Sequence, residues 1–313
     1  MAEDGFDLGP AWFWPDMQPM MAKLVEKLGL TSFAQYDDGD VLIDRPQGVQ
    51  RFAGFGQMAS SFRIAGGIGA LVAVLAAGLK QEQMRLGVTV ADAALRDDGV
   101  LLSARDGNGE TVSFEAEHVL FALPPRLLES TVTFTPAITP EFRARWRAMP
   151  TWMASHAKFL AMYDKPFWRE DGLSGTAQSM VGPLVEIHDA SSVSGSAALF
   201  GFVGVPAAAR QKLGEAVLKN ACLEQLVRLF GSAAADPIAV HFKDWAADPL
   251  TATADDRDAA ADHPMAAGKP WFDPAWADRA VMAGSETAQE HPGYLEGALD
   301  AARRAARKIA PAS

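Results

Sequence analysis

A lysine in an apolar stretch is the residue of this chain best suited to chemistry. Lys158 lies in "SHAKFLAMY", between Ala157 and Phe159. Because successive side chains of a strand point to opposite faces, a strand here places Lys158 on the face opposite those two neighbours. A buried ammonium can stabilise negative charge that develops in a transition state. Taken alone, however, the pattern is more typical of a solvated lysine on a strand face.

A second candidate lies near the end of the sequence, in "AVMAGSETAQEHPGYLEGALDAARRAARKIA", residues 280–310. An apolar strand, a polar turn and Pro292-Gly293-Tyr294 precede an alanine- and arginine-rich helix. The free N–H groups and the positive dipole end of a helix N-terminus attract anions. The alternative is a well-capped surface helix. In both cases the periodicity predicts one buried face, formed by Leu295, Leu299, Ala302, Ala306 and Ile309.

The other reactive side-chain types give weaker signals. Cys222, the one cysteine, has apolar neighbours at helical spacing, which predicts a buried structural residue rather than a nucleophile. Trp245 follows an apolar strand and is equally compatible with a core or a rim position. The histidines lack the spacing of metal ligands, so no metal site is predicted and surface or capping positions are expected. These histidines are His156, His188, His241, His263 and His291.

Composition excludes several classes of partner. The chain has 313 residues and a formal net charge of -11, whereas a nucleic-acid-binding protein needs a basic face. No apolar run approaches the length of a membrane span, and the acidic N-terminal residues do not form a signal peptide. A cytoplasmic protein without nucleic-acid or membrane partners is therefore expected.

Periodicity and turn signals predict alternating strands and helices. Helices are expected at 17–30, at 66–80 after two glycines, and around Cys222. Residues 84–123 are expected to form successive β segments, of which "HVLFAL" is predicted to be a fully buried strand ended by two prolines. Further strands are expected at 31–36, 41–46, 155–163, 197–204 and 237–246, with a loop at 164–175.

Six segments resemble the flavin-containing amine oxidoreductase family, the monoamine oxidase-like FAD enzymes. The most specific is the closing stretch, where "AGSET" and "GYLEGALDAARRAA" resemble the strand, turn and helix that wrap the flavin. "FDLGPAWFWP" resembles the segment that passes beside the isoalloxazine, and "KFLAMYDKPFWRE" resembles the family's lysine-bearing stretch. The segments "FRIAGGIGALVAVLA", "LGVTV" and "VLFALPPRLL" resemble parts that return to the FAD domain. The resemblance extends over nearly the whole chain.

The resemblance implies three catalytic residues. Lys158 would hold a water against flavin N5 and assist reoxidation by oxygen, Trp245 would pack along the flavin, and Tyr294 would form one wall of an aromatic cage for the amine. The second wall would fall near Ala254 or Asp255, where the sequence has no aromatic residue. The resemblance therefore implies half of an amine cage.

The resemblance also implies a cofactor, FAD. The binding should be non-covalent, because the corresponding stretch lacks the cysteine that some members attach to the flavin. Gly293 is expected to let the ligand approach the backbone, and the N–H groups of Tyr294 and Leu295 are expected to face the electron-rich edge of the flavin. The implied cofactor contacts are Gly9, Pro10, Ala11, Trp12, Val88, Trp245, Gly284, Ser285, Glu286, Gly293, Tyr294 and Leu295.

One feature of the family has no match. Its Gly-rich dinucleotide fingerprint is absent, since "GGIGAL" lacks the spacing and follows no clear strand. Three explanations are open: a gene model that starts late, a genuine partial homologue, or a second polypeptide that supplies the missing unit. In the last two cases the exposed sheet edges would need cover, by self-association or by a partner chain.

The expected fold class is α/β with mixed α+β character. An incomplete Rossmann-like domain of the FAD- or NAD(P)-binding type would be interleaved with a substrate domain built on a mixed β-sheet with helices. Residues 1–10, 60–125 and 241–313 are assigned to the FAD-binding-type domain without its N-terminal βαβ, and residues 11–59 and 126–240 to the substrate domain.

The favoured function is oxidation of the C–N bond of an amine or amino acid. A hydride would pass to the flavin, with O2 as acceptor and H2O2 as product. Two alternatives stay open. The first is a non-catalytic partial homologue or accessory subunit that does not bind FAD by itself. The second is a flavoenzyme of the same superfamily with a non-amine substrate.

Overall fold

The computed structural model describes residues 5–54, 60–258, 263–265 and 270–309, which form two compact units. Unit 1 comprises Met1–Gly78 and Ser155–Ala247, and unit 2 comprises Leu79–Ala154 and Asp248–Ser313. These boundaries differ from the predicted division at residues 10, 59, 125 and 240. The assignment of a flavin or a substrate role to each part stays a prediction.

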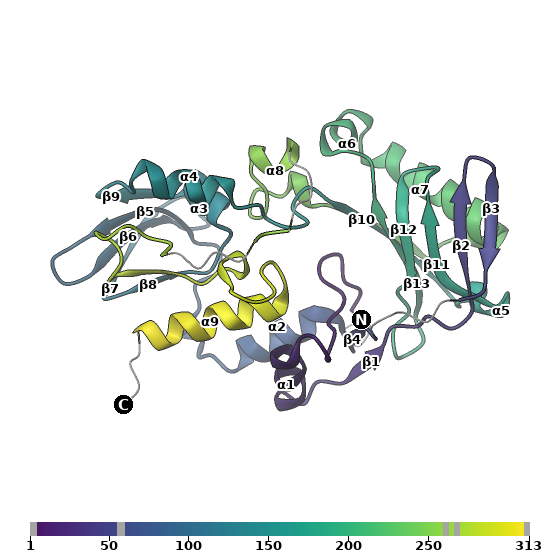
Figure 1. Ribbon diagram of the computed structural model, residues 1–313, viewed down its shortest axis with the longest axis horizontal. Helices are drawn as coiled ribbons and strands as arrows, with labels where there is room; N and C mark the ends of the chain where they lie inside the picture. The colour runs from purple at the N-terminus through teal and green to yellow at the C-terminus, as the bar shows by residue number, and fades with distance from the viewer. Residues whose placement is uncertain (1–4, 55–59, 259–262, 266–269, 310–313) are drawn as a thin grey trace. The chain divides into compact units, whose positions relative to one another are not determined.

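Unit 1 is built on a mixed seven-stranded sheet in the order β14-β10-β13-β12-β11-β2-β3 (Figure 1). Only β11 and β2 pair in parallel; the other neighbours described are antiparallel. The strands are β2 (Asp40–Arg45), β3 (Gly48–Phe52), β10 (Ala157–Tyr163), β11 (Leu173–Ser179), β12 (Leu184–Asp189), β13 (Ala197–Val203) and β14 (Ala239–Asp244).

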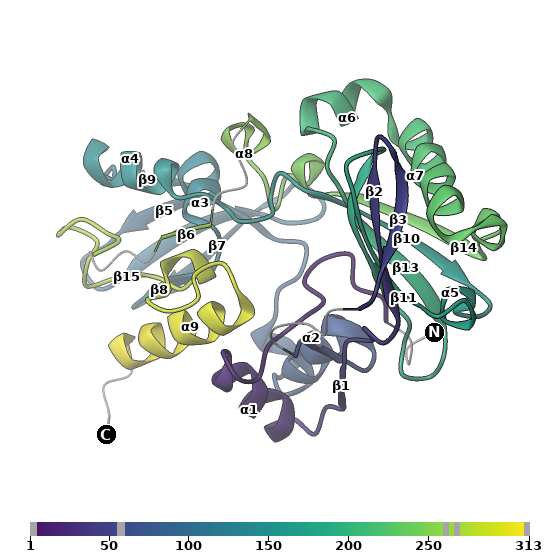
Figure 2. The same ribbon diagram turned by 45° about the vertical axis from the view of Figure 1, so that its right-hand side comes forward.

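One face of this sheet packs against α7 (Glu215–Phe230), which runs alongside it in Figure 2. Cys222 and Leu226 of the helix are buried against Phe159 and Leu199 of the sheet. Cys222 is therefore poorly suited to act as a nucleophile: it is fully buried, and desolvation, which disfavours the thiolate, raises its pKa to about 12.

The remainder of unit 1 is helical, apart from one short sheet. Strands β1 (Ser32–Ala34) and β4 (Phe62–Ile64) pair with each other, and α2 (Gly67–Ala77) begins directly after β4. The other helices of the unit are α1 (Pro19–Lys27), α5 (Phe167–Glu170) and α6 (Ala207–Leu213).

Unit 2 packs helices and two sheets around an aromatic core. Its four-stranded sheet has the order β7-β6-β5-β9, and β15 pairs in parallel with β8. Trp146, Trp276, Phe134 and Phe272 fill the core between these elements. The strands are β5 (Thr89–Leu95), β6 (Val100–Arg105), β7 (Thr111–Ala116), β8 (Val119–Phe121), β9 (Thr133–Thr135) and β15 (Ala280–Met282); the helices are α3 (Pro125–Thr131), α4 (Pro140–Ala148), α8 (Ala254–Asp258) and α9 (Leu295–Ile309).

Most predicted elements are confirmed, but three expectations outside the last helix are wrong. A strand, β4, does precede "GGIGAL". The predicted loop at 164–175 contains α5. The strand of "HVLFAL" is not fully buried, because Leu120 is 41% exposed between buried Val119 and Phe121. Alternation of side chains places Leu120 on the opposite face of the strand, which the described core does not cover.

The predicted buried face of the last helix is also wrong. The buried positions of α9 are Glu296, Gly297, Ala301 and Ala305, whereas Ala302 and Ala306 are exposed and the three larger residues are half-buried. Gly297, Ala301 and Ala305 form an i, i+4 line of small residues. A Cβ at Gly297 would lie 2.2 Å from the His291 carbonyl oxygen. The buried face of α9 is therefore the one whose small residues permit close approach of the backbone, and not the one with the most hydrophobic side chains.

Candidate functional site

Lys158 is buried, contrary to its appearance as a solvated lysine. Its exposure is 2%, and it lies on the face of β10 opposite Ala157 and Phe159, as predicted. Its ammonium donates to the backbone oxygens of Asp7 at 2.7 Å and Gly9 at 3.2 Å, and lies 4.0 Å from the ring centroid of Phe200. Backbone carbonyls and an aromatic face thus replace water around the charge.

Burial shifts the protonation equilibrium of this lysine. Desolvation lowers the pKa of Lys158 to about 7, the charge of Asp7 opposes the shift, and the charge of Arg63 adds to it. Desolvation also raises the pKa of Asp7, against the hydrogen bond from Ile68 and the charge of Lys158. Near neutral pH, Lys158 is therefore present in both protonation states, as expected of a group that holds or releases a proton.

The N-terminal segment that binds Lys158 is itself fixed at both ends. Asp7 Oδ1 accepts the Ile68 N–H at 2.8 Å, in the first turn of α2. Trp245 Nε1 donates to the Leu8 carbonyl oxygen at 2.9 Å, and a Cβ at Gly9 would lie 3.4 Å from the Trp245 ring. The fold therefore brings predicted residues Gly9, Lys158 and Trp245 together.

Aromatic side chains continue the same face of the sheet. Trp12 lies 5.3 Å from Phe200 and 6.4 Å from Phe202 between ring centroids, and its Nε1 donates to Gln35 Oε1 at 2.8 Å. Of the other predicted residues in this segment, Ala11 is buried and Pro10 is exposed. The face thus combines the Lys158 ammonium with a group of aromatic rings in mutual contact.

A polar pair that sequence reasoning missed lies on this face. His188 was expected at the surface, but it is only 7% exposed, and its ring packs against Trp12 at 4.9 Å and Phe200 at 5.4 Å. Its Nε2 lies 2.6 Å from Glu186 Oε1. That hydrogen bond lowers the pKa of Glu186, more than burial raises it. The alternation Glu186–Ile187–His188 in an apolar strand was the available signal, because it places both polar residues on one face.

In unit 2, Tyr294 has aromatic neighbours that are not those suggested by the sequence. Ala254 and Asp255 provide no aromatic residue, as predicted. Instead, Trp152 lies 4.6 Å and His263 lies 5.1 Å from the Tyr294 ring, and the Tyr294 hydroxyl is 3.3 Å from His263 Nε2. Only the tertiary fold brings these three rings together, since they come from separate segments.

The closing motif forms a compact turn with internal contacts that the sequence did not indicate. The Gly293 N–H donates to the Ser285 oxygen at 3.2 Å. A Cβ at Gly293 would meet Pro264 and Trp152 at 3.1–3.3 Å, so a glycine is required here by its φ of +83° and by protein packing, and its approach to a ligand stays a prediction. The Tyr294 N–H is used internally, because it donates to the His291 oxygen at 3.1 Å. The Leu295 N–H has no acceptor among the residues described.

The remaining predicted cofactor contacts have ordinary surroundings. Gly284 abuts the segment that follows β8, since a Cβ there would lie 2.7 Å from the Leu123 oxygen. Glu286 is 5% exposed, and desolvation raises its pKa despite hydrogen bonds from its own backbone and Ser285. Val88 is half-buried directly before β5. Their roles toward a flavin stay predictions.

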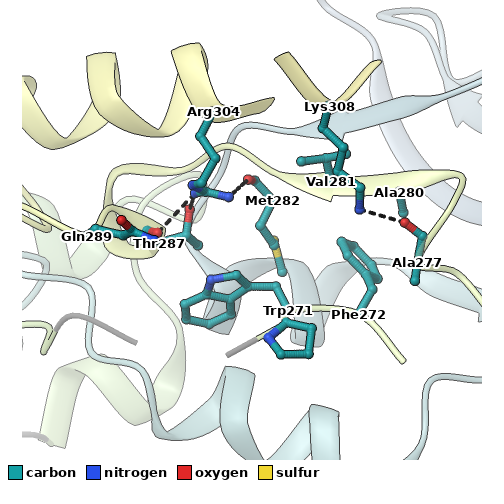
Figure 3. Close-up of a pocket in the computed structure, with 11 residues that line it drawn as sticks. Trp271, Phe272, Ala277, Ala280, Val281, Met282, Thr287, Gln289, Arg304 and Lys308 are labelled. Carbon is teal, nitrogen blue, oxygen red and sulfur yellow. Dashed lines mark hydrogen bonds between the residues drawn. The ribbon is translucent and has the colours of Figure 1, made fainter. Parts of the chain in front are cut away.

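A cavity of about 180 Å³ lies between β15, α9 and the Trp271–Phe272 segment (Figure 3). Its cations are already used: Arg304 donates to the oxygens of Met282 and Thr287, and Lys308 donates to the Ala277 oxygen. The cavity therefore offers no obvious catalytic group. Within the described ranges, no cluster of metal-ligating side chains occurs and no helix is long and apolar enough to span a membrane.

Comparison with known proteins assigns the family. Residues 40–310 match the family model of flavin containing amine oxidoreductases. The chain is 31% identical over 270 residues to "Putative flavin-containing monoamine oxidase AofH" of Mycobacterium tuberculosis, with 79% of this chain and 56% of that protein covered. It is 29% identical over 202 residues to human amine oxidase [flavin-containing] B, with 63% and 38% covered. The chain thus spans about half the length, or less, of these curated relatives.

Solved structures agree on the fold. A putrescine oxidase triple mutant matches with a TM-score of 0.78 at 20% identity, covering 97% of this chain and 88% of that one. Cyclohexylamine oxidase from Brevibacterium oxydans matches with a TM-score of 0.77 at 18% identity, covering 97% and 87%. The mixed α/β fold is thus that of amine oxidase structures, and the chain belongs to the flavin containing amine oxidoreductase family.

Proposed function

We propose that this protein oxidises amines with FAD as cofactor and oxygen as electron acceptor. The observation that carries the proposal is the buried Lys158 ammonium, held by the backbone of residues 7–9 beside Trp245. A buried cation is costly to maintain and tends to mark a functional site. Family membership supplies the cofactor class, and the relatives and neighbours named as amine oxidases suggest the substrate class.

The residues present fit a non-covalent flavin. The Leu295 N–H at the start of α9 lacks an acceptor among the described residues, so it is available to an electron-rich group. Cys222 is fully buried on the side of α7 that packs against the sheet, so it is not accessible for a covalent attachment. Within unit 1, Lys158 and Trp245 are the residues that we assign to the cofactor; the roles of Tyr294 and of the Leu295 N–H, both in unit 2, stay separate predictions.

FAD, when bound, would take a hydride from the carbon beside the amine nitrogen and then reduce oxygen to H2O2. The remaining chemistry belongs to the protein. Lys158 would hold a proton at Nζ, and its positive form would stabilise negative charge that develops nearby. The rings of Trp12, Phe200 and Phe202 exclude water from that charge, which strengthens its electrostatic effect. The iminium ion, which is the oxidised form of the substrate, would react with water to give a carbonyl compound and ammonium.

The visible spectrum of the purified full chain tests this function. We expect reconstitution with FAD to yield a yellow protein whose flavin bands are bleached by an amine under anaerobic conditions and return with oxygen. A folded chain that stays colourless after incubation with FAD would refute the proposal and favour a non-catalytic binding protein.

Lys158→Met is expected to impair one half-reaction selectively. Because the ammonium is assigned to oxygen reduction, reoxidation of the flavin should slow by about 100-fold, while reduction by the amine changes by less than about fivefold. Anaerobic and aerobic stopped-flow traces separate the two steps. Lys165→Met, at an exposed lysine paired with Glu170, is the control and should leave both rates unchanged. Equal losses in both half-reactions would contradict the assigned role.

A further inference from the structure

Asp7 makes two different contacts beside Lys158. Its main chain binds the lysine, because the Asp7 carbonyl oxygen accepts a hydrogen bond from Lys158 Nζ at 2.7 Å. Its side chain binds a helix, because Asp7 Oδ1 accepts the Ile68 N–H at 2.8 Å in the first turn of α2. One residue of the N-terminal segment therefore connects β10 to α2.

The bond to α2 is a helix cap that comes from a distant part of the chain. The N-cap residue of α2 is Gly66, which has no side chain to accept a hydrogen bond from the first turn. Asp7 fills this role although it lies 61 positions before Ile68. The fit is close, since a Cβ at Gly67 would lie 2.8 Å from Asp7 Oδ1. The cap thus fixes residue 7, and with it the carbonyl oxygen that binds the lysine.

Positive groups surround the Asp7 carboxylate. They are the Lys158 ammonium, the Arg63 guanidinium, which is 4% exposed, and the positive N-terminal end of the α2 dipole. In the described part of the chain, the side-chain charges that act on Lys158 are those of Asp7, which favours the ammonium, and of Arg63, which opposes it. Asp7 is therefore the carboxylate that offsets the positive charge around Lys158.

The cap by itself does not require a charge at residue 7. Asparagine and serine cap helices as well as aspartate does. Asp7 Oδ2 is buried and has no hydrogen-bond partner among the residues described, and Arg63 Nε is buried and unpaired in the same way. A buried carboxylate with one unpaired oxygen costs free energy, so its presence here indicates an electrostatic role. Lys158 is the group that gains from this charge.

We propose that Asp7 is a positioning residue for the Lys158 ammonium: its cap on α2 holds a carbonyl oxygen at Nζ, and its carboxylate keeps the proton on Lys158 against the repulsion of Arg63 and of the helix dipole. Asp7 thus determines which fraction of the protein carries a charged Lys158 near neutral pH. This effect does not depend on amine oxidation. Its consequence for the reaction of a flavin with oxygen rests on the proposed function.

Other titratable groups lie on the same sheet as Lys158. They come from three strands and from the residues just before β10, and none of them changes when Asp7 is replaced. A change in the protonation of Lys158 in such a variant therefore reports on Asp7. These groups are Lys243, which pairs with Lys158 across the sheet, His156, two positions before it, and Glu186 and His188 of β12, beyond β13.

NMR of the full chain labelled with ¹³C at the lysine ε-carbons measures the ionisation of Lys158, whose resonance is the one absent from Lys158→Met. Asp7→Asn keeps the size and the acceptor for the Ile68 N–H but removes the charge. We expect it to lower the pKa of Lys158 by about one unit, so that the charged fraction near pH 7 falls about fivefold. Asp7→Ser, a second uncharged variant, should shift the pKa in the same direction. Asp164→Asn, at an exposed carboxylate directly after β10, is the control and should leave it unchanged.

Urea unfolding below pH 7, where Lys158 is mostly charged, provides an independent measurement. The fall in the unfolding midpoint caused by Asp7→Asn should be smaller in the Lys158→Met background, because no ammonium is left for Asp7 to stabilise. Circular dichroism shows whether each variant keeps its fold. Equal falls in both backgrounds, or an unchanged pKa of Lys158 in Asp7→Asn, would overturn the positioning role.

The pH profile of flavin reoxidation separates this role from the proposed function. If the Lys158 ammonium assists oxygen reduction, the rate falls as pH rises through the pKa of Lys158, and in Asp7→Asn this fall should move to lower pH by the shift that NMR records. A lowered pKa of Lys158 together with an unmoved profile, or in a chain that does not bind FAD, supports the role of Asp7 and contradicts the proposed function.

Discussion

Replacing Lys158 by methionine should abolish a pH-dependent part of the protein's stability. Burial lowers the pKa of Lys158 to about 7 in the folded chain, against the ordinary 10.5 of a solvated lysine. Between these values the unfolded chain binds more protons than the folded one, so stability rises with pH by up to about 1.4 kcal/mol per unit. The destabilising cost of burying the charge is present below pH 7 and is relieved as pH rises. The methionine variant, which has no charge to bury, should lack this rise.

Urea unfolding of both proteins between about pH 7 and pH 9.5 measures the effect. The difference in unfolding free energy between Lys158→Met and the wild type should be largest at the low-pH end, on the order of several kcal/mol, and should shrink as pH increases. Lys165→Met, at an exposed surface position, should follow the wild type. The charged groups that act on Lys158 or pair with it across the sheet, Asp7, Arg63 and Lys243, are the same in all three proteins. Parallel stability curves for wild type and Lys158→Met would show that Lys158 titrates normally.

Removing the charge of Asp256 should destabilise unit 2 by about 3 to 5 kcal/mol. Asp256 Oδ1 lies 2.5 Å from Arg126 Nη1, with side-chain exposures of 2% and 9%. Asp256 Oδ2 also accepts from the backbone N–H and the hydroxyl of Thr253. In Asp256→Asn the Arg126 guanidinium stays buried without a countercharge, which costs far more than losing an exposed pair. The midpoint of urea unfolding reports the change.

The adjacent Asp255 offers a matched control, because it is exposed on the same short helix. Asp255→Asn should change the unfolding free energy by less than about 0.5 kcal/mol. In the double variant Arg126→Met with Asp256→Asn, the cost should be smaller than the sum of the two single changes, since no buried charge is left unpaired. Additive costs in that cycle would mean that the two side chains do not stabilise each other.

The sequence predicted where strands and helices form better than it predicted which of their faces are buried. The strand that carries Lys158, the helix after Gly66-Gly67 and the β segments from 84 to 123 follow from local periodicity and turn residues, and they are confirmed. The buried face of α9 was predicted wrongly from hydrophobicity, because it depends on how closely Gly297 approaches the His291 carbonyl. Leu120 shows the same limit, since its exposure depends on what packs against β8.

In the candidate site, too, the local features could be predicted from the sequence and the contacts with distant segments could not. The lysine, its strand and its orientation away from Ala157 and Phe159 could be read from alternation alone. The partners of that lysine could not: Asp7 and Gly9 lie about 150 residues away in the chain, and their backbone oxygens carry no sequence signal. His188 was misplaced at the surface because alternation shows only that it shares a face with Glu186, and not that Trp12 packs against that face. Trp152 and His263 escaped notice beside Tyr294 because they come from segments without a shared motif.

By itself, the sequence determined the family, through the motif that ends in Gly293-Tyr294-Leu295. It also determined where most strands and helices form, because these depend on residues that are neighbours in the chain. The tertiary structure alone decided that Lys158 is buried and that its pKa is lowered, because desolvation depends on atoms brought in from distant segments. It also decided that Glu186 and His188 share a surface with Lys158, because strand order and register, not sequence distance, place residues side by side in a sheet.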